Sequence, residues 1–303
     1  MRCFYCLPAG FKGFETPENW LTFDEIERVI GTFTRLGVRR VRLTGGEPLV
    51  RKNLPDLITR LSALEGLEDL SLSTNASLLS TYAKEIKQAG VSRINVSLDT
   101  LDAAQFTKIT GNGKLDQVLA GLQAAKDAGL APLKINTVAM KGINDHQFID
   151  LVKYCADMDF TLRFIETMPI GSTGRNASEN YLDLQRVIDQ LNKEFDLIPS
   201  LFSGGGPARY YKVKGTKLHI GFITPISQHF CETCNRVRLS VDGTLYLCLG
   251  DEHKFELRHL LRAGISDSEL EAVILNAIDL KPEKHEFNSK PENVIRFMSM
   301  TGG

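Results

Sequence analysis

The sequence lacks any apolar run long enough to cross a bilayer, and it shows no secretory signal segment. It also lacks an excess of charge, because 36 Lys and Arg residues balance 37 Asp and Glu residues to a formal net charge of −1. Such a balance gives no electrostatic signature of binding to nucleic acid or to an anionic membrane. These absences predict a cytoplasmic protein with no nucleic-acid or membrane partner. A chain of 303 residues can hold one large core with a smaller appended unit.

Cysteine is scarce and unevenly distributed, since five of the six cysteines fall into two groups near the two ends of the chain. In a reducing compartment, clustered cysteines bind metal more often than they form disulfides. A Cys-x-x-Cys turn also lets two thiolates converge on one metal centre without backbone strain. We therefore expect two metal centres, one formed by Cys3 and Cys6 and the other by Cys231, Cys234 and Cys248.

Short β-like runs alternate with amphipathic patterns between residue 20 and about residue 166. The expected strands cover residues 38–44, 69–75, 94–99, 133–139 and 161–166, with helices such as 23–36, 53–64, 115–128 and 146–157 between them. This alternation predicts βαβ units in a parallel sheet or barrel. Beyond residue 180 the pattern changes to a helix over 182–195, a hairpin over 210–223, short strands over 237–240 and 245–247, and two helices near 257–262 and 268–278.

Four of the expected strands carry polar side chains on one face. The polar rows are Arg40, Arg42 and Thr44; Ser71, Ser73 and Asn75; Asn95, Ser97 and Asp99; and Lys134 and Asn136. Buried parallel strands are normally apolar on both faces, and barrel interiors are normally filled by branched aliphatic side chains. The rows therefore predict a polar cavity inside the barrel. The alternative is a series of solvated edge strands, although four such strands in succession are hard to accommodate at edges.

The N-terminal pair, Cys3-x-x-Cys6, is compatible with zinc, with a redox dithiol or with an iron–sulfur cluster. Tyr5 between the thiols and Gly45-Gly46-Glu47-Pro48 after the first strand favour the cluster. Together they resemble the radical S-adenosylmethionine superfamily, whose signature is Cys-x-x-x-Cys-x-x-Cys with an aromatic residue before the last cysteine. Its first cysteine would lie two places before this chain begins, so we expect an amino-terminal truncation or a start codon placed too late.

The C-terminal group places thirteen residues between Cys234 and Cys248, and Asn235-Arg236-Val237-Arg238 follows its first pair. In extended backbone, Arg236 and Arg238 share a face, and guanidinium groups suit phosphate oxygens. A structural zinc site with His229 or His253 as fourth ligand is the alternative.

Matches in order over nearly the whole chain resemble the GTP 3′,8-cyclase family of molybdenum cofactor biosynthesis. They comprise Val41-Arg42-Leu43-Thr44-Gly45-Gly46-Glu47-Pro48, Ile94-Asn95-Val96-Ser97-Leu98-Asp99, Arg163-Phe164-Ile165-Glu166, Gly206-Pro207-Ala208 and the C-terminal cysteines. The resemblance implies an α/β fold, namely an incomplete parallel (βα) TIM-type barrel of the radical SAM type over residues 1–175. A C-terminal α+β region over residues 176–303 would cover its open side. It also implies a lyase that cyclises GTP to (8S)-3′,8-cyclo-7,8-dihydroguanosine 5′-triphosphate.

The resemblance further implies two [4Fe-4S] clusters, with Cys3 and Cys6 on the first and Cys231, Cys234 and Cys248 on the second. The residues at the positions that contact S-adenosylmethionine are Tyr5, Gly46, Ser97 and Met168. Those at the positions that contact GTP are Arg42, Ser73, Lys134, Arg236 and Arg238. Ala76 stands where the family often has glycine, and Ser73 where it usually has threonine.

The implied partners are a flavodoxin-like reductant, a downstream cyclic pyranopterin monophosphate synthase and a second copy of the chain in a homodimer. Gly302-Gly303 would reach into the cavity and assist activation, unless the tail is disordered. Two alternatives remain open. One is a GTP-binding iron–sulfur or zinc protein without turnover, and the other is a radical peptide-modifying enzyme with auxiliary clusters.

Overall fold

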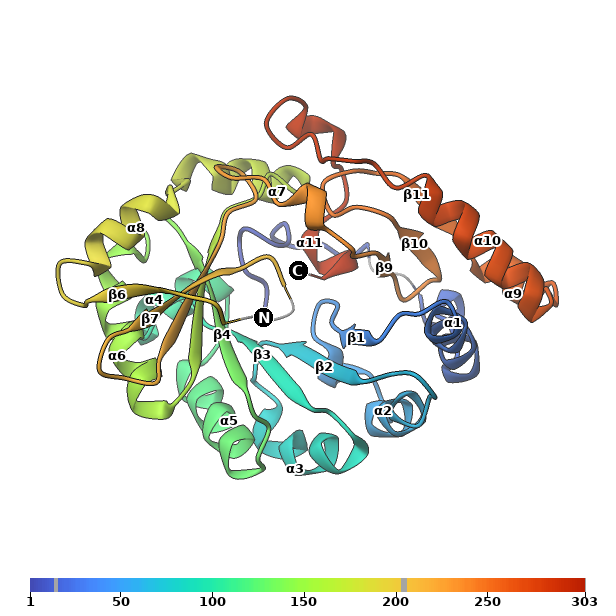
Figure 1. Ribbon diagram of the computed structural model, residues 1–303, viewed down its shortest axis with the longest axis horizontal. Coiled ribbons are helices and arrows are strands. Elements are labelled where there is room, and N and C mark those ends of the chain that lie inside the picture. Colours follow the sequence, from blue (N-terminus) through green and yellow to red (C-terminus); the bar gives the residue numbers. More distant parts are fainter. Residues whose placement is uncertain (14–15, 203–205, 303) are drawn as a thin grey trace.

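An eight-stranded sheet forms the body of the computed structural model, which describes residues 1–13, 16–202 and 206–302. The strand order is β1-β2-β3-β4-β5-β8-β7-β6. Figure 1 shows this sheet curving around an interior, with helices along its outer side. The strands are β1 Arg40–Leu43, β2 Asp69–Thr74, β3 Arg93–Ser97, β4 Leu133–Ala139, β5 Thr161–Glu166, β6 Leu197–Ser200, β7 Arg209–Val213 and β8 His219–Ile223.

Neighbouring strands from β1 to β5 are parallel, and so are β5 and β8. Parallel neighbours need a crossover connection, which helices supply here as the alternating sequence pattern predicts. Strands β7 and β6 run antiparallel and end the sheet on the side away from β1. Because the two ends of the sheet are not paired with each other, the fold is an incomplete TIM-type barrel, as expected. The helices of this part are α1 Phe23–Arg35, α2 Leu54–Ser62, α3 Leu79–Ala89, α4 Ala103–Thr110, α5 Leu115–Asp127, α6 Phe148–Met158, α7 Gly171–Ala177 and α8 Leu184–Leu191.

The apolar residues of the strands pack against the outer helices. Leu72, Val96 and Phe164 belong to one buried core together with Ile86 of α3 and Leu122 of α5. Side chains alternate across a strand, so the polar rows point to the opposite, inner face. The predicted polar interior is therefore confirmed. The edge-strand alternative is wrong for β2, β3 and β4, because each of them has a paired neighbour on both sides.

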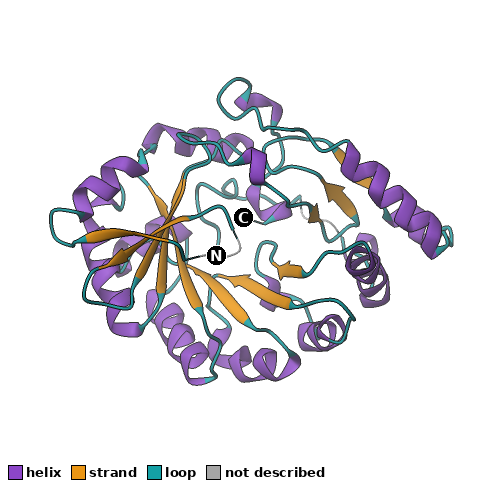
Figure 2. Ribbon diagram, viewed as in Figure 1, coloured by secondary structure: helices purple, strands orange, loops and turns teal. Residues whose placement is uncertain are grey.

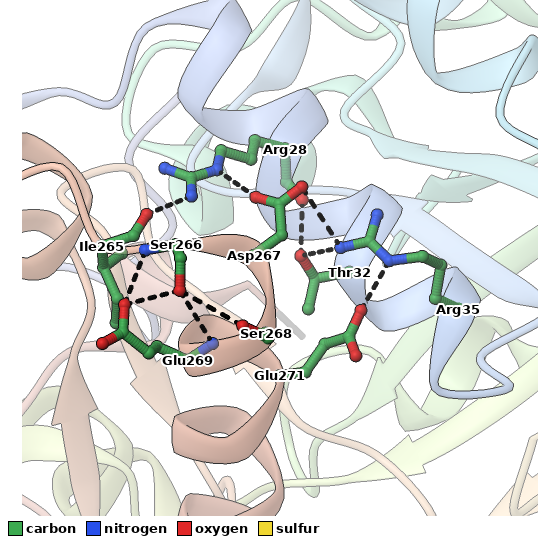
Figure 3. A network of polar contacts seen from close by, with 9 residues as sticks. All are labelled: Arg28, Thr32, Arg35, Ile265, Ser266, Asp267, Ser268, Glu269 and Glu271. Carbon is green, nitrogen blue, oxygen red and sulfur yellow. Dashed lines mark hydrogen bonds and ion pairs between the residues drawn. The ribbon is translucent and has the colours of Figure 1, made fainter.

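A smaller antiparallel sheet lies on the open side of the barrel, beside β1 (Figure 1). Its order is β11-β10-β9, and α9, α10 and α11 follow it in the chain. A second buried core joins Leu245 and Ile274 of this region to Val29 and Phe33 of α1. Figure 3 shows how arginines of α1 meet carboxylates of α10 along the same seam. The elements are β9 Arg238–Leu239, β10 Thr244–Tyr246, β11 Lys254–Glu256, α9 Arg258–Arg262, α10 Asp267–Asp279 and α11 Met298–Thr301.

The main sheet extends beyond residues 1–175, the segment that was expected to form the barrel. Strands β6, β7 and β8 follow residue 176 in the chain, yet they continue the sheet from β5 (Figure 2). The expected division after residue 175 thus falls inside α7 and within one continuous sheet. No helix in the described part of the chain is both long and apolar enough to traverse a bilayer.

Candidate active site

The N-terminal cysteine turn, residues 3–7, is fixed by backbone hydrogen bonds. The amide of Cys6 donates to the carbonyl of Cys3 at 2.9 Å, and the amide of Leu7 donates to the same carbonyl at 3.2 Å. The amide of Phe4 donates to the carbonyl of Ile109 at 3.1 Å, which anchors the turn on the end of α4. Both thiols are free. A tight turn of this kind allows both sulfurs to converge on one metal centre.

Tyr5 ties this turn to the carboxyl ends of β3 and β4. Its hydroxyl donates to Oδ2 of Asp99 at 2.6 Å, while Oδ1 of Asp99 accepts the amide of Val138 at 2.8 Å. Burial raises the pKa of Asp99 to about 6. Burial, together with the charge of Asp99, raises the pKa of Cys3 to about 12. The Cys3 thiol therefore ionises only when positive charge, such as a bound metal supplies, offsets this environment.

The loop after β1 is pinned to β2 by Glu47. Its carboxylate accepts the hydroxyl of Thr74 at 2.7 Å and the amide of Asn75 at 2.8 Å. Burial raises the pKa of Glu47. Gly45 has a φ of 126°, a left-handed conformation that favours glycine. Gly46 is exposed, so its backbone is accessible to a ligand at the carboxyl end of the barrel.

The chain end reaches the same loop. Gly302 is buried, and a Cβ atom added to it would lie 2.3 Å from Cγ2 of Thr44. Figure 1 shows α11 and the C-terminal end inside the ring of elements. The expectation that the tail enters the interior thus holds for Gly302, whereas Gly303 lies outside the described residues.

The polar rows are aligned across the inner face of the sheet. Ser97 of β3 pairs with Asn136 of β4, which pairs with Arg163 of β5. Two residues earlier along β3 and β4, Asn95 pairs with Lys134 and also with Ser73 of β2, so these three residues form a similar row. Arg163 donates to Oδ1 of Asn95, whose amide nitrogen lies 3.4 Å from Oγ of Ser73. The register thus brings the predicted Ser73, Ser97 and Lys134 onto one surface.

Cations crowd this inner face. Burial, followed by the charges of Arg163, Arg93 and Arg42, lowers the pKa of Lys134 to about 8. Burial and the charges of Arg163, Arg93 and Arg236 lower the pKa of Arg42 to about 10. Each cation is destabilised by its neighbours, so a polyanion bound among them would relieve their repulsion. The charge of Arg236 is among those that act on Arg42, so the two predicted arginines repel each other across the interior.

The C-terminal cysteine segment is built from a 3₁₀ turn and a strand pair. The turn spans Cys231–Thr233, and the amide of Cys234 donates to the carbonyl of Cys231 at 2.9 Å. Tyr246 of β10 pairs with Arg238 of β9, which brings Cys248 back towards the turn. The three thiols, Cys231, Cys234 and Cys248, are free.

Positive charge surrounds these thiols. Burial acts to raise the pKa of Cys234, but the amide and guanidinium of Arg236, with the charge of Lys281, together hold it below its ordinary value. Nη2 of Arg236 lies 3.4 Å from Sγ of Cys234. Burial and the charge of Arg236 lower the pKa of Arg238 to about 10, whereas Cys248 and Cys234 act to raise it. Both predicted arginines therefore stand beside the thiols.

A pocket of about 260 Å³ opens beside this segment. It joins a strand of the barrel to the C-terminal region, since its lining includes Arg40 of β1 as well as Cys234 and Arg236. The residues that line it are Arg40, Gly206, Pro207, Phe230, Thr233, Cys234, Asn235 and Arg236. Of the motif predicted at residues 206–208, Gly206 and Pro207 therefore meet the cysteine turn across this pocket.

The three thiols of the C-terminal group fit the donor set of an iron–sulfur cluster, and Cys3 and Cys6 supply two such thiolates at the N-terminal turn. Among residues 1–13, 16–202 and 206–302, no three Cys, His, Asp or Glu side chains already converge on a point that a single ion would occupy. A four-iron cluster binds each thiolate through a different iron, so its ligands stand farther apart than those of one ion. The two alternative zinc ligands have other neighbours: Nδ1 of His253 contacts Asp251, and the ring of His229 lies 5.0 Å from that of His285.

Sequence reasoning missed several residues that shape the site. Asp99 was placed in a polar row but not recognised as the partner of Tyr5, and Arg163 was noted only as part of a motif. The alternation of Arg163 with Leu162 and Phe164 is the signal that would have placed it inside the barrel. Met168 lies just after β5, where it packs against the small core of Ile170, Phe287 and Val294.

Comparisons with known proteins agree with this geometry. Residues 1–155 match the Radical SAM superfamily, and residues 160–287 match Molybdenum Cofactor Synthesis C. The chain is 46% identical over 309 residues to the GTP 3′,8-cyclase of Hydrogenovibrio crunogenus, covering 100% of this chain and 93% of the relative. It is 45% identical to the same enzyme of Paracoccus denitrificans, covering 100% of this chain and 89% of the relative. For Marinobacter nauticus the identity is 42%, with coverage of 100% and 92%.

Among solved structures, coproporphyrinogen III oxidase from Escherichia coli aligns with a TM-score of 0.43 and 14% identity, over 64% of this chain and 48% of that chain. The sequence relatives, by contrast, are matched from end to end of this chain. The chain belongs to the GTP 3′,8-cyclase family of the radical SAM superfamily.

Proposed function

We propose that this protein cyclises GTP to (8S)-3′,8-cyclo-7,8-dihydroguanosine 5′-triphosphate, the first step of molybdenum cofactor biosynthesis. The observation that carries the proposal is the cation-lined inner face of the barrel, which has one cysteine group at its N-terminal turn and the other beside Arg236. A triphosphate supplies negative charge that would offset the mutual repulsion of these cations.

Cys3 and Cys6 would hold the first cluster, and Tyr5, Gly46, Ser97 and Met168 would bind S-adenosylmethionine. When bound, the cluster supplies the electron that splits S-adenosylmethionine into methionine and a 5′-deoxyadenosyl radical. Ser97 stands at the carboxyl end of β3 and Gly46 just beyond that of β1, the edge where barrel enzymes bind their substrates. The role of the chain is to keep water out and to aim the radical at the 3′ hydrogen of the ribose.

Lys134, Arg42, Arg236 and Arg238 would bind the triphosphate, and the hydroxyl of Ser73 would add a neutral hydrogen bond. Each charge-assisted hydrogen bond contributes about 1.5–3 kcal/mol. Four of them approach the roughly 8 kcal/mol that corresponds to micromolar affinity. Cys231, Cys234 and Cys248 would hold the second cluster, since three thiolates leave one iron open to a substrate ligand. With the nucleotide held at both ends, the sugar carbon C3′ is positioned to attack C8 of guanine.

Three partners accompany this activity in our proposal: a flavodoxin-like reductant, a cyclic pyranopterin monophosphate synthase that takes the product, and a second copy of the chain. The proposed reaction consumes two electrons per turnover: one cleaves S-adenosylmethionine, and the second, with a proton, reduces the nucleotide radical that remains after C3′ has attacked C8. A low-potential donor delivers both electrons. In this proposal the synthase then rearranges the cyclised nucleotide.

The test is anaerobic turnover with GTP, S-adenosylmethionine and a chemical reductant after reconstitution with iron and sulfide. Two forms are compared: the chain as it stands, and a form extended so that a third cysteine lies four residues before Cys3. We expect the extended form to produce 5′-deoxyadenosine and the cyclised nucleotide, and its Cys6→Ala variant to produce neither. If the extended form retains both clusters and binds GTP, yet forms no 5′-deoxyadenosine, the proposal is wrong.

A further inference from the structure

Arg296 is a buried arginine that none of the predicted ligand sets contains. The residue is 4% exposed, although arginine is rarely buried without a dedicated partner. Its Nη2 donates to the carbonyl of Cys248 at 2.8 Å and to that of Leu249 at 2.5 Å, and its Nη1 donates to the carbonyl of Asp251 at 2.7 Å. The guanidinium also lies 4.7 Å from the ring centre of Tyr246. One side chain thus binds three backbone carbonyls of the loop that carries the third C-terminal cysteine.

Glu252 completes this arrangement from the other side. Its Oε1 lies 2.9 Å from Nη1 of Arg296. The same oxygen accepts the backbone amides of Ile295 at 3.1 Å and of Arg296 at 3.3 Å. The loop therefore holds the tail through a carboxylate while the tail holds the loop through a guanidinium.

The segment that carries Arg296 is also bound by residues of α7. The amide of Gly171 donates to the carbonyl of Val294 at 3.1 Å, and Nη1 of Arg175 donates to the same carbonyl at 3.1 Å. A Cβ atom at Gly171 would lie 2.8 Å from the carbonyl oxygen of Arg296, so the backbones pack without room for a side chain. Six residues later, Gly302 packs against Thr44 beside Gly45-Gly46. The tail therefore links the loop of Cys248, which Arg296 binds, to the loop after β1, against which Gly302 packs.

We propose that Arg296 and Glu252 form a two-sided clamp that fixes the tail, residues 294–302, to the loop of Cys248 and so sets the position of the chain end against Thr44. Both are positioning residues, because they act through the backbone and touch neither proposed substrate. The consequence for turnover rests on the proposed function: the clamp couples the C-terminal cysteine segment to the edge of the barrel where S-adenosylmethionine would bind.

The two halves of the clamp make different predictions. In Glu252→Gln the three carbonyl contacts of Arg296 remain, and the negative charge that strengthens the contacts of Oε1 with Arg296 and with the amides of residues 295 and 296 is lost. Only the amides of residues 295–302 should therefore exchange hydrogen faster. In Arg296→Met the amides of both the tail and residues 248–252 should exchange faster. Loss of a charge-assisted contact corresponds to an increase of about tenfold or more. The matched controls are Glu271→Gln and Arg35→Met, which break an arginine–glutamate pair between α1 and α10.

The measurement is segment-resolved hydrogen exchange on the full chain before iron, GTP or S-adenosylmethionine is added, followed by iron content after reconstitution. The clamp also predicts that Arg296→Met retains less iron at the C-terminal segment, with a changed spectroscopic signature, whereas Glu252→Gln retains it. Because exchange is measured without turnover, a failed clamp leaves the proposed function standing, and a failed turnover assay leaves the clamp standing. If Arg296→Met does not fold, Glu252→Gln decides. Tail exchange in Glu252→Gln equal to that in Glu271→Gln would overturn the clamp.

Discussion

The two cysteine groups share the Cys-x-x-Cys spacing, but their surroundings carry opposite charge. At the N-terminal turn, burial and the carboxylate of Asp99 raise the pKa of Cys3 to about 12. At the C-terminal segment, the amide and guanidinium of Arg236 outweigh burial and hold the pKa of Cys234 below its ordinary value. The spacing alone therefore does not determine the chemistry of a thiol pair. We expect the C-terminal group to bind metal more readily at neutral pH, because its ligands lose their protons more easily.

Each group is tied to the barrel by a buried carboxylate, and the two carboxylates differ in the number of donors that they accept. Asp99 accepts two donors and supports the N-terminal turn through Tyr5. Glu166, at the end of β5, accepts four donors and supports the loop of residues 224–228 that leads to Cys231. If these supports act independently, damage to one should leave the other group unchanged.

Glu166→Gln should have the largest effect. The carboxylate accepts the amides of Ile226 at 2.8 Å and Ser227 at 3.1 Å and the hydroxyls of Ser227 and Tyr181, so a glutamine side chain would keep one oxygen acceptor and lose the charge that strengthens all four hydrogen bonds. A hydrogen bond to a charged group contributes about 1 kcal/mol more than a neutral one, so the free energy of unfolding should fall by about 2–5 kcal/mol. Urea denaturation measures this loss. The exposed Glu179→Gln should change it by less than about 0.5 kcal/mol.

A loss in Glu166→Gln no larger than that of Glu179→Gln would show that the loop before Cys231 does not depend on this carboxylate. Hydrogen exchange of residues 3–7 should be unaffected in the variant. A change there of the same size as that at residues 224–231 would contradict the independence of the two supports.

The fold was largely predictable because period-two and helical patterns survive in the barrel strands and helices. Residues 133–139 and 161–166 form β4 and β5 with both ends as expected. Strand β1 is shorter than expected, because the amide of Val38 donates to the carbonyl of Phe33 at 2.9 Å and so completes the end of α1. Strand β6 was missed because Pro199 interrupts its pattern, which an edge strand tolerates.

Elements and contacts that depend on distant residues were not predictable. Helix α7 contains Gly171 and Gly174, poor helix formers, and contacts from the tail hold it in place. Within the site, the alternation rule placed Ser73, Ser97, Lys134, Arg236 and Arg238 on shared faces, since it requires only neighbouring residues. The carbonyls that Arg296 binds lie 45–48 residues away, and no local pattern indicates such a contact.

Asp99→Asn should change the pH dependence of stability. The pKa of Asp99 is raised from an ordinary 3.8 to about 6, so the folded protein holds an extra proton between these values. Stability therefore falls as pH rises from about 4 to about 6, by up to about 3 kcal/mol, and the variant lacks this component. The difference in unfolding free energy between the two proteins, measured by denaturation from pH 4 to pH 7, should follow this slope. A difference independent of pH would mean that Asp99 is not desolvated as described.

Lys134 should give GTP binding a dependence on alkaline pH. Its pKa of about 8 in the free protein means that the cation is lost as pH rises, whereas a bound triphosphate stabilises it. Affinity should fall by about tenfold between pH 7 and pH 9, which corresponds to about 1.4 kcal/mol. Isothermal titration with GTP measures the effect. Lys134→Met should bind more weakly at pH 7 and lose this slope; an equal slope in the variant would assign the titration to another group.

Arg35→Met should have the smallest effect on stability. The variant tests whether the α1–α10 seam, rather than the carboxylates of Asp99 and Glu166, holds the two cysteine groups apart. Nε of Arg35 lies 2.6 Å from Oε1 of Glu271, but the arginine side chain is 47% exposed (Figure 3). Exposed ion pairs contribute little and are screened by salt. The thermal midpoint should therefore fall by about 2 °C or less, and by even less in 1 M salt. A loss of stability as large as that of Glu166→Gln would instead place the main restraint at the α1–α10 seam.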